Sequence, residues 1–316
     1  MANPKYLWWN GKVMPWEDAT IHVTDMGWST VGAIFEGIRA YWNPDDEEAY
    51  VFRLPEHMRR FEQSMKLVRL EQEYSTDSLI DTILELIRAN EHREDIYIRP
   101  LAYRAGGGGG GGGFSGFGSE AGILINTSSR PTHLKTGKTQ HACVSSWTRI
   151  SDNVMPPRVK NISNYRNGQL ATMEANINGY DVPLLLNDQR KIAEGPGACV
   201  VMVRDGKLVT PGVTDSILES ITRDAIIQMA RDDLGLVVEE RAIDRTEMYI
   251  ADEAFMCGTA AEITPILSVD RYQLGNGEIG PVTSQLEDLF LGVLRGTDSR
   301  HSDWRTPVGL RQLAKA

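Results

Sequence analysis

The chain has few cysteines, and their positions exclude two kinds of structural framework. Cys143, Cys199 and Cys257 are the only cysteines in 316 residues, and no two of them have the Cys-x-x-Cys spacing typical of zinc and redox sites. An odd number of isolated cysteines also gives no basis for a set of disulfides. We therefore expect no structural metal site and no fold that depends on disulfides.

Long apolar runs and an excess of basic residues are also missing. No apolar segment approaches the roughly 20 residues of a membrane-spanning helix, and residues 1–9 lack the basic head and apolar run of a signal peptide. The 33 Lys and Arg residues are outnumbered by 43 Asp and Glu residues, so they cannot form a strong phosphate-neutralising surface. The sequence predicts a cytoplasmic protein that binds neither nucleic acid nor membrane.

The length and the local patterns predict two α/β domains. Asn10-Gly11 predicts a tight β-hairpin, and Pro55 predicts the start of a helix, where a missing N–H does no harm. A polar segment with a proline and a glycine, residues 128–139, is expected to connect the domains. We expect a small N-terminal α/β domain over residues 1–127 and a larger C-terminal domain over residues 140–316.

Eight consecutive glycines occupy residues 106–113. Such a run could cradle a phosphate or could serve as a flexible linker. A phosphate-binding P-loop needs Lys-Ser or Lys-Thr after its last glycine and a helix behind it, and this sequence has neither. The pattern therefore favours the flexible loop, since glycine loses more conformational freedom on ordering than any other residue.

The most informative pattern lies between residues 158 and 197. Lys160 ends the triplet Arg-Val-Lys, Tyr165 follows it, and Glu194 begins the acidic turn Glu-Gly-Pro-Gly. A lysine amine can bind a carbonyl compound covalently where it is deprotonated at modest cost. In this order and with these neighbours, the three residues resemble the cofactor-binding residues of fold-type IV pyridoxal-phosphate (PLP) enzymes.

Five further blocks extend this resemblance over most of the chain and make it specific to the branched-chain amino acid aminotransferases. In chain order they are Phe-Glu-Gly-Ile-Arg (35–39), Glu-His-Met-Arg-Arg-Phe (56–61), Tyr-Ile-Arg-Pro-Leu (97–101), Ile-Thr-Arg-Asp-Ala-Ile (221–226) and Gly-Thr-Ala-Ala-Glu-Ile-Thr-Pro (258–265). One block could arise by chance, whereas five in family order around the lysine are specific. The resemblance implies a fold of type IV, with a small N-terminal α/β domain and a larger C-terminal domain of pseudo-barrel character.

The resemblance implies PLP as the cofactor and gives a role to each of these residues. Lys160 binds the cofactor aldehyde and moves the substrate proton, Glu194 faces the pyridine nitrogen, and Tyr165 faces the ring's 3-oxygen. A dianionic phosphate is suited to an arginine and a helix N-terminus. The remaining cofactor-binding residues are expected to be Arg60, Leu218, Ile221, Thr222 and Thr259. From the residues alone, a solvated arginine at Arg60 and a plain helix cap at Thr222 stay open.

The resemblance also implies a substrate site, and here the sequence departs from the family. Many members carry a tyrosine four residues before the Phe of the first block, where this chain has Val31. The segment between the domains lacks aromatic residues that often line the pocket. A surface ion pair remains an alternative role for Arg99. The substrate-binding residues are expected to be Val31, Phe35, Gly37, Tyr97, Arg99, Thr259 and Ala260.

The expected activity is transfer of the amino group of branched-chain L-amino acids to 2-oxoglutarate by a ping-pong mechanism. Small-molecule amino donors and 2-oxo acids are then the partners, and a homodimer or higher homo-oligomer is implied. One alternative is a transaminase of broader scope that accepts (R)-primary amines. Another is a PLP-dependent lyase similar to aminodeoxychorismate lyase, which the 35–39 and 258–265 blocks disfavour.

Overall fold

The computed structural model describes residues 3–23, 31–104 and 121–313. The chain divides into two compact units, and the division does not follow chain order. The first unit comprises Met1–Pro131, Val159–Ser163 and Val293–Ala316, and the second comprises Thr132–Arg158 and Asn164–Gly292. The glycine run expected to form a flexible loop lies outside the described residues.

An eight-stranded sheet forms the framework of the first unit, with the order β16-β5-β4-β6-β7-β1-β2 and β3 paired to β6. All its pairings are antiparallel. The strands are β1 (Tyr6–Trp9), β2 (Lys12–Pro15), β3 (Ile34–Phe35), β4 (Ile38–Asn43), β5 (Glu48–Phe52), β6 (Ile96–Arg104), β7 (Ala121–Ser129) and β16 (Arg305–Pro307).

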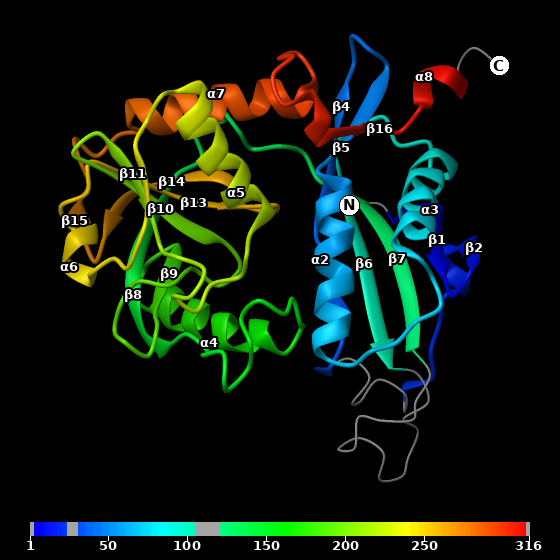
Figure 1. Ribbon diagram of the computed structural model, residues 1–316, viewed down its shortest axis with the longest axis horizontal. Helices are drawn as coiled ribbons and strands as arrows, with labels where there is room; N and C mark the ends of the chain where they lie inside the picture. Colours follow the sequence, from blue (N-terminus) through cyan, green and yellow to red (C-terminus); the bar gives the residue numbers. More distant parts are fainter. Residues whose placement is uncertain (1–2, 24–30, 105–120, 314–316) are drawn as a thin grey trace. The chain divides into compact units, whose positions relative to one another are not determined.

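Two amphipathic helices cover one face of this sheet, α2 (Leu54–Leu67) and α3 (Thr76–Ala89); Figure 1 shows them alongside β6 and β7. Their apolar residues form one core with alternate residues of the strands, among them Ile96 and Ile98. Because successive side chains of a strand point to opposite faces, Tyr97 and Arg99 lie on the face away from the helices. The predicted substrate residues of β6 therefore share the face that the helices leave uncovered.

A second eight-stranded sheet forms the other unit, with the order β12-β11-β10-β13-β14-β8-β9 and β15 paired to β14. Parallel and antiparallel pairs are mixed in it. The strands are β8 (Gln140–Thr148), β9 (Val182–Leu186), β10 (Cys199–Arg204), β11 (Lys207–Thr210), β12 (Val238–Glu240), β13 (Glu253–Gly258), β14 (Glu262–Val269) and β15 (Tyr272–Gln273).

Helices pack on the second sheet from several parts of the chain. The helix α4 contacts β8 and β9, and α5 contacts β13, as their places beside these strands in Figure 1 show. The helices that complete the chain are α4 (Asn164–Ile177), α5 (Ile221–Gln228), α6 (Arg245–Met248), α7 (Pro281–Arg295) and α8 (Leu310–Leu313). The predicted α/β fold class is confirmed, and the structure adds that each unit is built around its own sheet.

Several local predictions are confirmed, and the division of the chain differs from the expected one. Asn10 and Gly11 adopt positive φ in the β1–β2 turn, and α2 has proline in its first turn. The first unit ends near the expected connection, at Pro131, but it also contains the C-terminal segment from Val293. The reason is β16, which completes the first sheet by pairing antiparallel with β5, a contact that local sequence patterns do not reveal.

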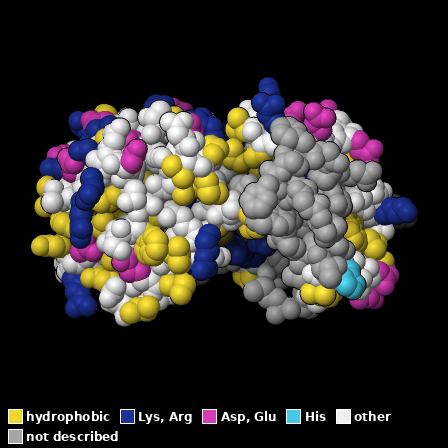
Figure 2. All heavy atoms as spheres, turned by 90° about the horizontal axis from the view of Figure 1, so that it is seen from below, with side chains coloured by type: hydrophobic (Ala, Val, Ile, Leu, Met, Phe, Trp, Pro, Cys, Tyr) yellow, Lys and Arg dark blue, Asp and Glu magenta, His cyan; other side chains and the backbone are white. Residues whose placement is uncertain are grey.

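The surface carries charges of both signs. Figure 2 shows Lys and Arg side chains interspersed with Asp and Glu side chains on the face that it draws. Among the helices that the structure describes, none is both long and apolar enough to cross a membrane.

Candidate functional site

Lys160 lies on a short segment that packs into the core of the first unit. Its neighbour Val159 belongs to that core, and the Lys160 backbone accepts from Phe35 N at 3.0 Å and donates to Ser64 Oγ at 3.3 Å. The Lys160 amine lies 4.7 Å from the centroid of the Phe35 ring. Only 9% of the residue is exposed, so Lys160 is no ordinary surface lysine.

A buried carboxylate, Glu36, holds the predicted phosphate-binding arginine. Arg60 Nε donates to Glu36 Oε1 at 2.7 Å, and Arg60 Nη2 donates to Glu36 Oε2 at 2.8 Å. His57, one turn earlier on α2, places Nδ1 2.8 Å from Glu36 Oε2. The paired hydrogen bonds fix the plane of the guanidinium, whereas Arg59 beside it is exposed.

The protonation of this cluster follows from its burial and its charges. Burial alone would raise the pKa of Glu36, but Arg60 and the hydrogen bond from His57 outweigh it and hold that pKa far below its usual range. Burial lowers the pKa of His57, and Glu36 opposes this only in part. Glu36 is therefore an ionised carboxylate beside a neutral imidazole.

Two of the predicted substrate residues of the first unit, Gly37 and Arg99, lie against Tyr97. A Cβ atom at Gly37 would lie 1.9 Å from the Tyr97 hydroxyl oxygen, so glycine is required for the tyrosine to occupy this place. Arg99 Cζ lies 5.6 Å from the Tyr97 ring centroid and 6.0 Å from that of Phe35. Val31 is 49% exposed.

Glu194 is the buried carboxylate of the second unit, and an arginine neutralises it. Arg149 Nη2 lies 2.7 Å from Glu194 Oε1, with side chains 7% and 5% exposed. The Leu218 backbone N–H donates to Glu194 Oε2 at 3.2 Å, and the Cys199 thiol lies 3.8 Å from the same oxygen. Burial, and then the charge of Glu194, raise the pKa of Cys199 well above its usual value, so the thiol stays protonated.

Two glycines let α4 approach the turn that carries Glu194. A Cβ atom at Gly168 would lie 2.7 Å from the Pro196 carbonyl oxygen. A Cβ atom at Gly197 would lie 3.3 Å from the Tyr165 ring. Tyr165, in the first turn of α4, therefore lies directly beside the acidic turn, as its predicted role requires.

The helix α5 presents its N-terminus with a side-chain cap. The Ser220 hydroxyl accepts from Arg223 N at 3.2 Å, so Ile221 and Thr222 form the first turn. Thr222 is 2% exposed. Arg223 anchors the helix to β11 and β12 through Thr210, Pro211 and Glu240. An anchored helix N-terminus is a favourable place for an anion.

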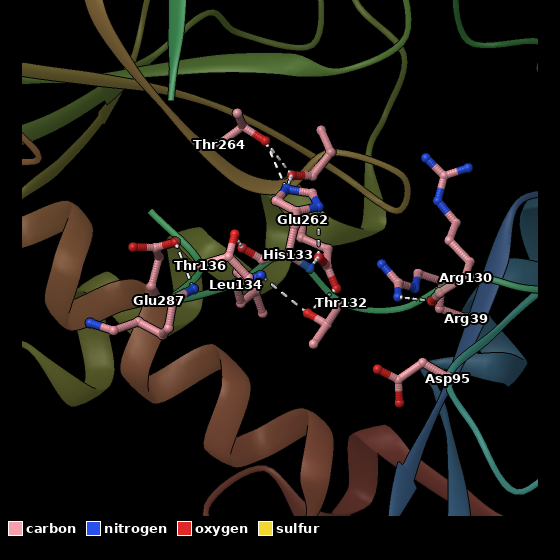
Figure 3. Close-up of polar contacts among 12 residues, drawn as sticks. Arg39, Asp95, Arg130, Thr132, His133, Leu134, Thr136, Glu262, Thr264 and Glu287 are labelled. Carbon is pink, nitrogen blue, oxygen red and sulfur yellow. Dashed lines mark hydrogen bonds and ion pairs between the residues drawn. The ribbon is translucent and has the colours of Figure 1, made fainter. Parts of the chain in front are cut away.

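The turn of residues 259–261, between β13 and β14, is held by a second buried carboxylate in this unit. Glu262 adopts a φ of 48° and is 1% exposed. Its carboxylate accepts from Thr132 Oγ1 and His133 N, both at 2.8 Å, and lies 3.0 Å from His133 Nδ1. His133 Nε2 lies 2.8 Å from the Ala261 carbonyl oxygen, as Figure 3 shows for this network. Both ring nitrogens of His133 thus lie within hydrogen-bonding distance of oxygen atoms that border this turn.

The structure groups the predicted site residues within the two units. The first unit contains Val31, Phe35, Gly37, Arg60, Tyr97, Arg99 and Lys160, and the second contains Tyr165, Glu194, Leu218, Ile221, Thr222, Thr259 and Ala260. Sequence reasoning missed Arg149, His133 and Glu262 as supporting residues. Glu262 lies inside the 258–265 block, which could have indicated its role. No local sequence pattern indicates the roles of Arg149 and His133, because their partners are distant in sequence.

The described residues contain no group of three or more His, Cys, Asp or Glu side chains placed to hold a metal ion. Among the described residues, the two units provide a buried amine, two arginine-bound carboxylates and a capped helix N-terminus.

Comparisons with known proteins agree with this arrangement. Residues 33–269 match the family model described as amino-transferase class IV. A branched-chain amino acid aminotransferase from Thermobaculum terrenum, solved in its PLP form, is 52% identical with a TM-score of 0.94, covering 98% of this chain and 100% of that one. A probable branched-chain-amino-acid aminotransferase of Aquifex aeolicus is 40% identical over 96% of both chains. The Escherichia coli branched-chain-amino-acid aminotransferase is 37% identical over 96% of this chain and 97% of its own.

We expect Glu36→Gln to lower the free energy of unfolding by about 3–5 kcal/mol at pH 7, because it leaves the buried guanidinium of Arg60 without its counter-charge. The pKa of Glu36 is lower in the folded state than its ordinary value of 4.5. Its contribution to stability is therefore present above about pH 4.5 and is lost as the pH falls through the lower folded value. Urea unfolding of both proteins between pH 7 and pH 3 measures the difference.

Glu91→Gln is the matched control, because Glu91 pairs with Lys5 at the surface of the same unit, with side chains 73% and 59% exposed. Such surface pairs contribute little to stability, because solvent screens them. Equal losses in the two variants would contradict the role given to the buried pair.

Proposed function

We propose, since the chain belongs to the amino-transferase class IV family, that it transfers the amino group of branched-chain L-amino acids to 2-oxoglutarate with PLP as its cofactor. The observation that carries the proposal is the buried Arg149–Glu194 pair, because an ionised carboxylate is what keeps a pyridine nitrogen protonated. The similarity to branched-chain amino acid aminotransferases supports the donor class. The cytoplasmic location and the homo-oligomer expected from the sequence stay predictions.

The residues present fit PLP. Lys160 offers a primary amine, Glu194 a buried carboxylate for the ring nitrogen, and the α5 N-terminus with Thr222 a place for the phosphate. Arg60 adds a guanidinium whose plane is already fixed by Glu36. When bound, PLP supplies an aldehyde that captures the amine of the substrate and a ring that accepts the electron pair left at its α-carbon.

The chain's own residues then perform the proton transfers and the positioning. With PLP bound, Lys160 Nζ would take the proton from the substrate α-carbon and return it on the cofactor side, as general base and then general acid. Glu194 would hold the charge at the ring nitrogen, and Tyr165 would donate to the ring oxygen. Because the first oxo acid would leave before the second enters, the kinetics would be ping-pong.

The direct test is an assay of the purified protein with PLP, L-leucine and 2-oxoglutarate. We expect stoichiometric glutamate and 4-methyl-2-oxopentanoate, and parallel double-reciprocal lines typical of a ping-pong mechanism. Failure to form glutamate from L-leucine and 2-oxoglutarate would contradict the proposal.

Lys160 is expected to be the residue that carries the cofactor. Borohydride reduction of the holoenzyme should fix PLP to one peptide, and mass spectrometry should place it on Lys160. Lys160→Ala should lose both the label and the activity, since no other group supplies the amine. Lys207→Ala, at an exposed lysine that pairs with Glu239, is the control and should keep both.

Glu194→Gln should lower kcat by about 100-fold or more, because the substitution keeps the shape but removes a charge that acts in a buried site. Cofactor affinity should change far less, since Thr222, Thr259 and Arg60 bind the phosphate. Fluorescence titration of the apoprotein with PLP and steady-state kinetics separate the two effects.

Glu253→Gln is the matched control for Glu194→Gln. Glu253 is 7% exposed and accepts three hydrogen bonds from Val282 and Thr283, so its loss should lower stability without lowering kcat. If the Glu194→Gln enzyme kept the wild-type kcat, the role proposed for the Glu194 carboxylate would be contradicted.

A broader donor range is the second candidate function, and Val31 favours it. Valine lacks the ring area and the hydroxyl of the tyrosine that many family members carry there, and this side chain is 49% exposed. We expect the enzyme to accept L-leucine and also bulkier donors, with weak selectivity for size.

Val31→Tyr should raise the ratio of kcat/KM for L-leucine over (R)-1-phenylethylamine, because the added ring narrows the pocket. The ratio should rise about tenfold, which is within the range of discrimination that one added apolar group gives in a pocket. The measurement is a donor panel of L-leucine and both enantiomers of 1-phenylethylamine. An unchanged ratio would show that residue 31 does not line the pocket.

A further inference from the structure

Three segments of the second unit that carry predicted cofactor residues come together around Cys199. Its Sγ lies 3.8 Å from Glu194 Oε2 and 3.7 Å from the Leu218 carbonyl oxygen. In the β10–β13 ladder, Cys199 stands opposite Cys257, which precedes Thr259 by two residues. Only 2% of Cys199 is exposed, so these contacts are shielded from water.

The backbone of the acidic turn places Cys199 beside Glu194. The two residues form an antiparallel bridge, and Gly195 N donates to the Ala198 carbonyl oxygen at 2.9 Å. Residues directly opposite each other in an antiparallel pair have their side chains on the same face. The contact between the thiol and the carboxylate therefore follows from a turn that backbone hydrogen bonds fix.

The thiol is the donor in its contact with Glu194. Burial, and then the charge of Glu194, raise the pKa of Cys199 well above its usual value, so the sulfur keeps its proton. A thiol is a weak donor, and hydrogen bonds to an ionised acceptor are stronger than those to a neutral one. The S–H group therefore points to the carboxylate rather than to the Leu218 carbonyl oxygen.

The two oxygens of Glu194 are held from different segments. Arg149 Nη2 lies 2.7 Å from Oε1, whereas the Leu218 N–H donates to Oε2 at 3.2 Å and the Cys199 thiol approaches the same Oε2. A hydrogen bond to the charged form of a carboxylate favours that form. Cys199 thus stabilises the charge of Glu194 and ties its Oε2 to the segment that leads into α5.

We propose that Cys199 is a positioning residue whose thiol, by a hydrogen bond to Glu194, keeps this carboxylate ionised and oriented toward the ring nitrogen of the cofactor. The inference rests on the proposed function and adds a residue from outside the sequence blocks that resemble the family. Cys199 acts through Glu194 and takes no part in the proton transfers of Lys160. Without the thiol, the proton at the ring nitrogen shifts toward Glu194.

Nitrogen-15 NMR of the holoenzyme, prepared with PLP labelled at the ring nitrogen, measures this effect. Cys199→Ala removes the donor, so the shift should move toward that of a neutral nitrogen. In single-turnover measurements the rate constant at saturating L-leucine should fall about three- to tenfold, as expected for the loss of one weak hydrogen bond. The leucine concentration that gives half of this rate should stay within about twofold, since ground-state binding is unchanged. Cys199→Ser keeps a hydroxyl donor and should keep the wild-type shift.

The infrared S–H stretching band of the apoprotein reads the same hydrogen bond without the cofactor, because the band moves to lower frequency when a thiol donates. The difference spectrum between wild type and Cys199→Ala isolates the band of Cys199. Glu194→Gln should move that band to higher frequency, since the charged acceptor is lost. Cys143→Ala is the matched control, a buried thiol on β8 of the same unit. It should leave the Cys199 band, the nitrogen-15 shift and the rate constant unchanged.

Two results would overturn the proposal. A Cys199→Ala holoenzyme with the wild-type nitrogen-15 shift would show that the thiol only fills space. A Glu194→Gln protein with the wild-type S–H band would show that the thiol does not donate to this carboxylate. A wild-type holoenzyme that does not convert L-leucine would instead overturn the proposed function, while the S–H band of the apoprotein still decides whether Cys199 holds Glu194.

Discussion

The buried ion pair between Arg149 and Glu194 is the constraint on which the proposed chemistry depends. A carboxylate removed from water takes up a proton unless a cation or hydrogen-bond donors hold its charge. Here a guanidinium 2.7 Å away and the Leu218 N–H do so. The local fold serves this pair, since Gly168 lets α4 reach the turn that carries Glu194.

The first unit also contains a buried ion pair between a glutamate and an arginine, but its role is different. Glu36 is also a buried carboxylate bound by an arginine, and its burial would be unfavourable without Arg60 and His57. There the carboxylate orients the arginine, whereas at Glu194 the arginine holds the carboxylate. In each unit a charged group is thus fixed by a partner from another segment of that unit, and such preorganisation is what electrostatic catalysis requires.

Local chemistry in the sequence was enough to predict some elements and most named residues, but not their partners. Asn10-Gly11 and Pro55 act through backbone conformation alone, so the first hairpin and α2 were predictable. Lys160, Glu194 and Thr222 were predicted as site residues because a family motif surrounds each. Arg149 and His133 were not, because each acts through a contact that only the folded chain creates. The same reason explains why local patterns did not predict the pairing of β16 with β5.

The central claim is that Glu194 stays ionised and keeps the ring nitrogen of the cofactor protonated. The most direct measurement is the nitrogen-15 NMR shift of the wild-type holoenzyme prepared with PLP labelled at that nitrogen. The account predicts the shift of a protonated pyridine nitrogen at every pH at which the protein stays folded and active. A shift typical of the neutral nitrogen in the active enzyme would contradict it.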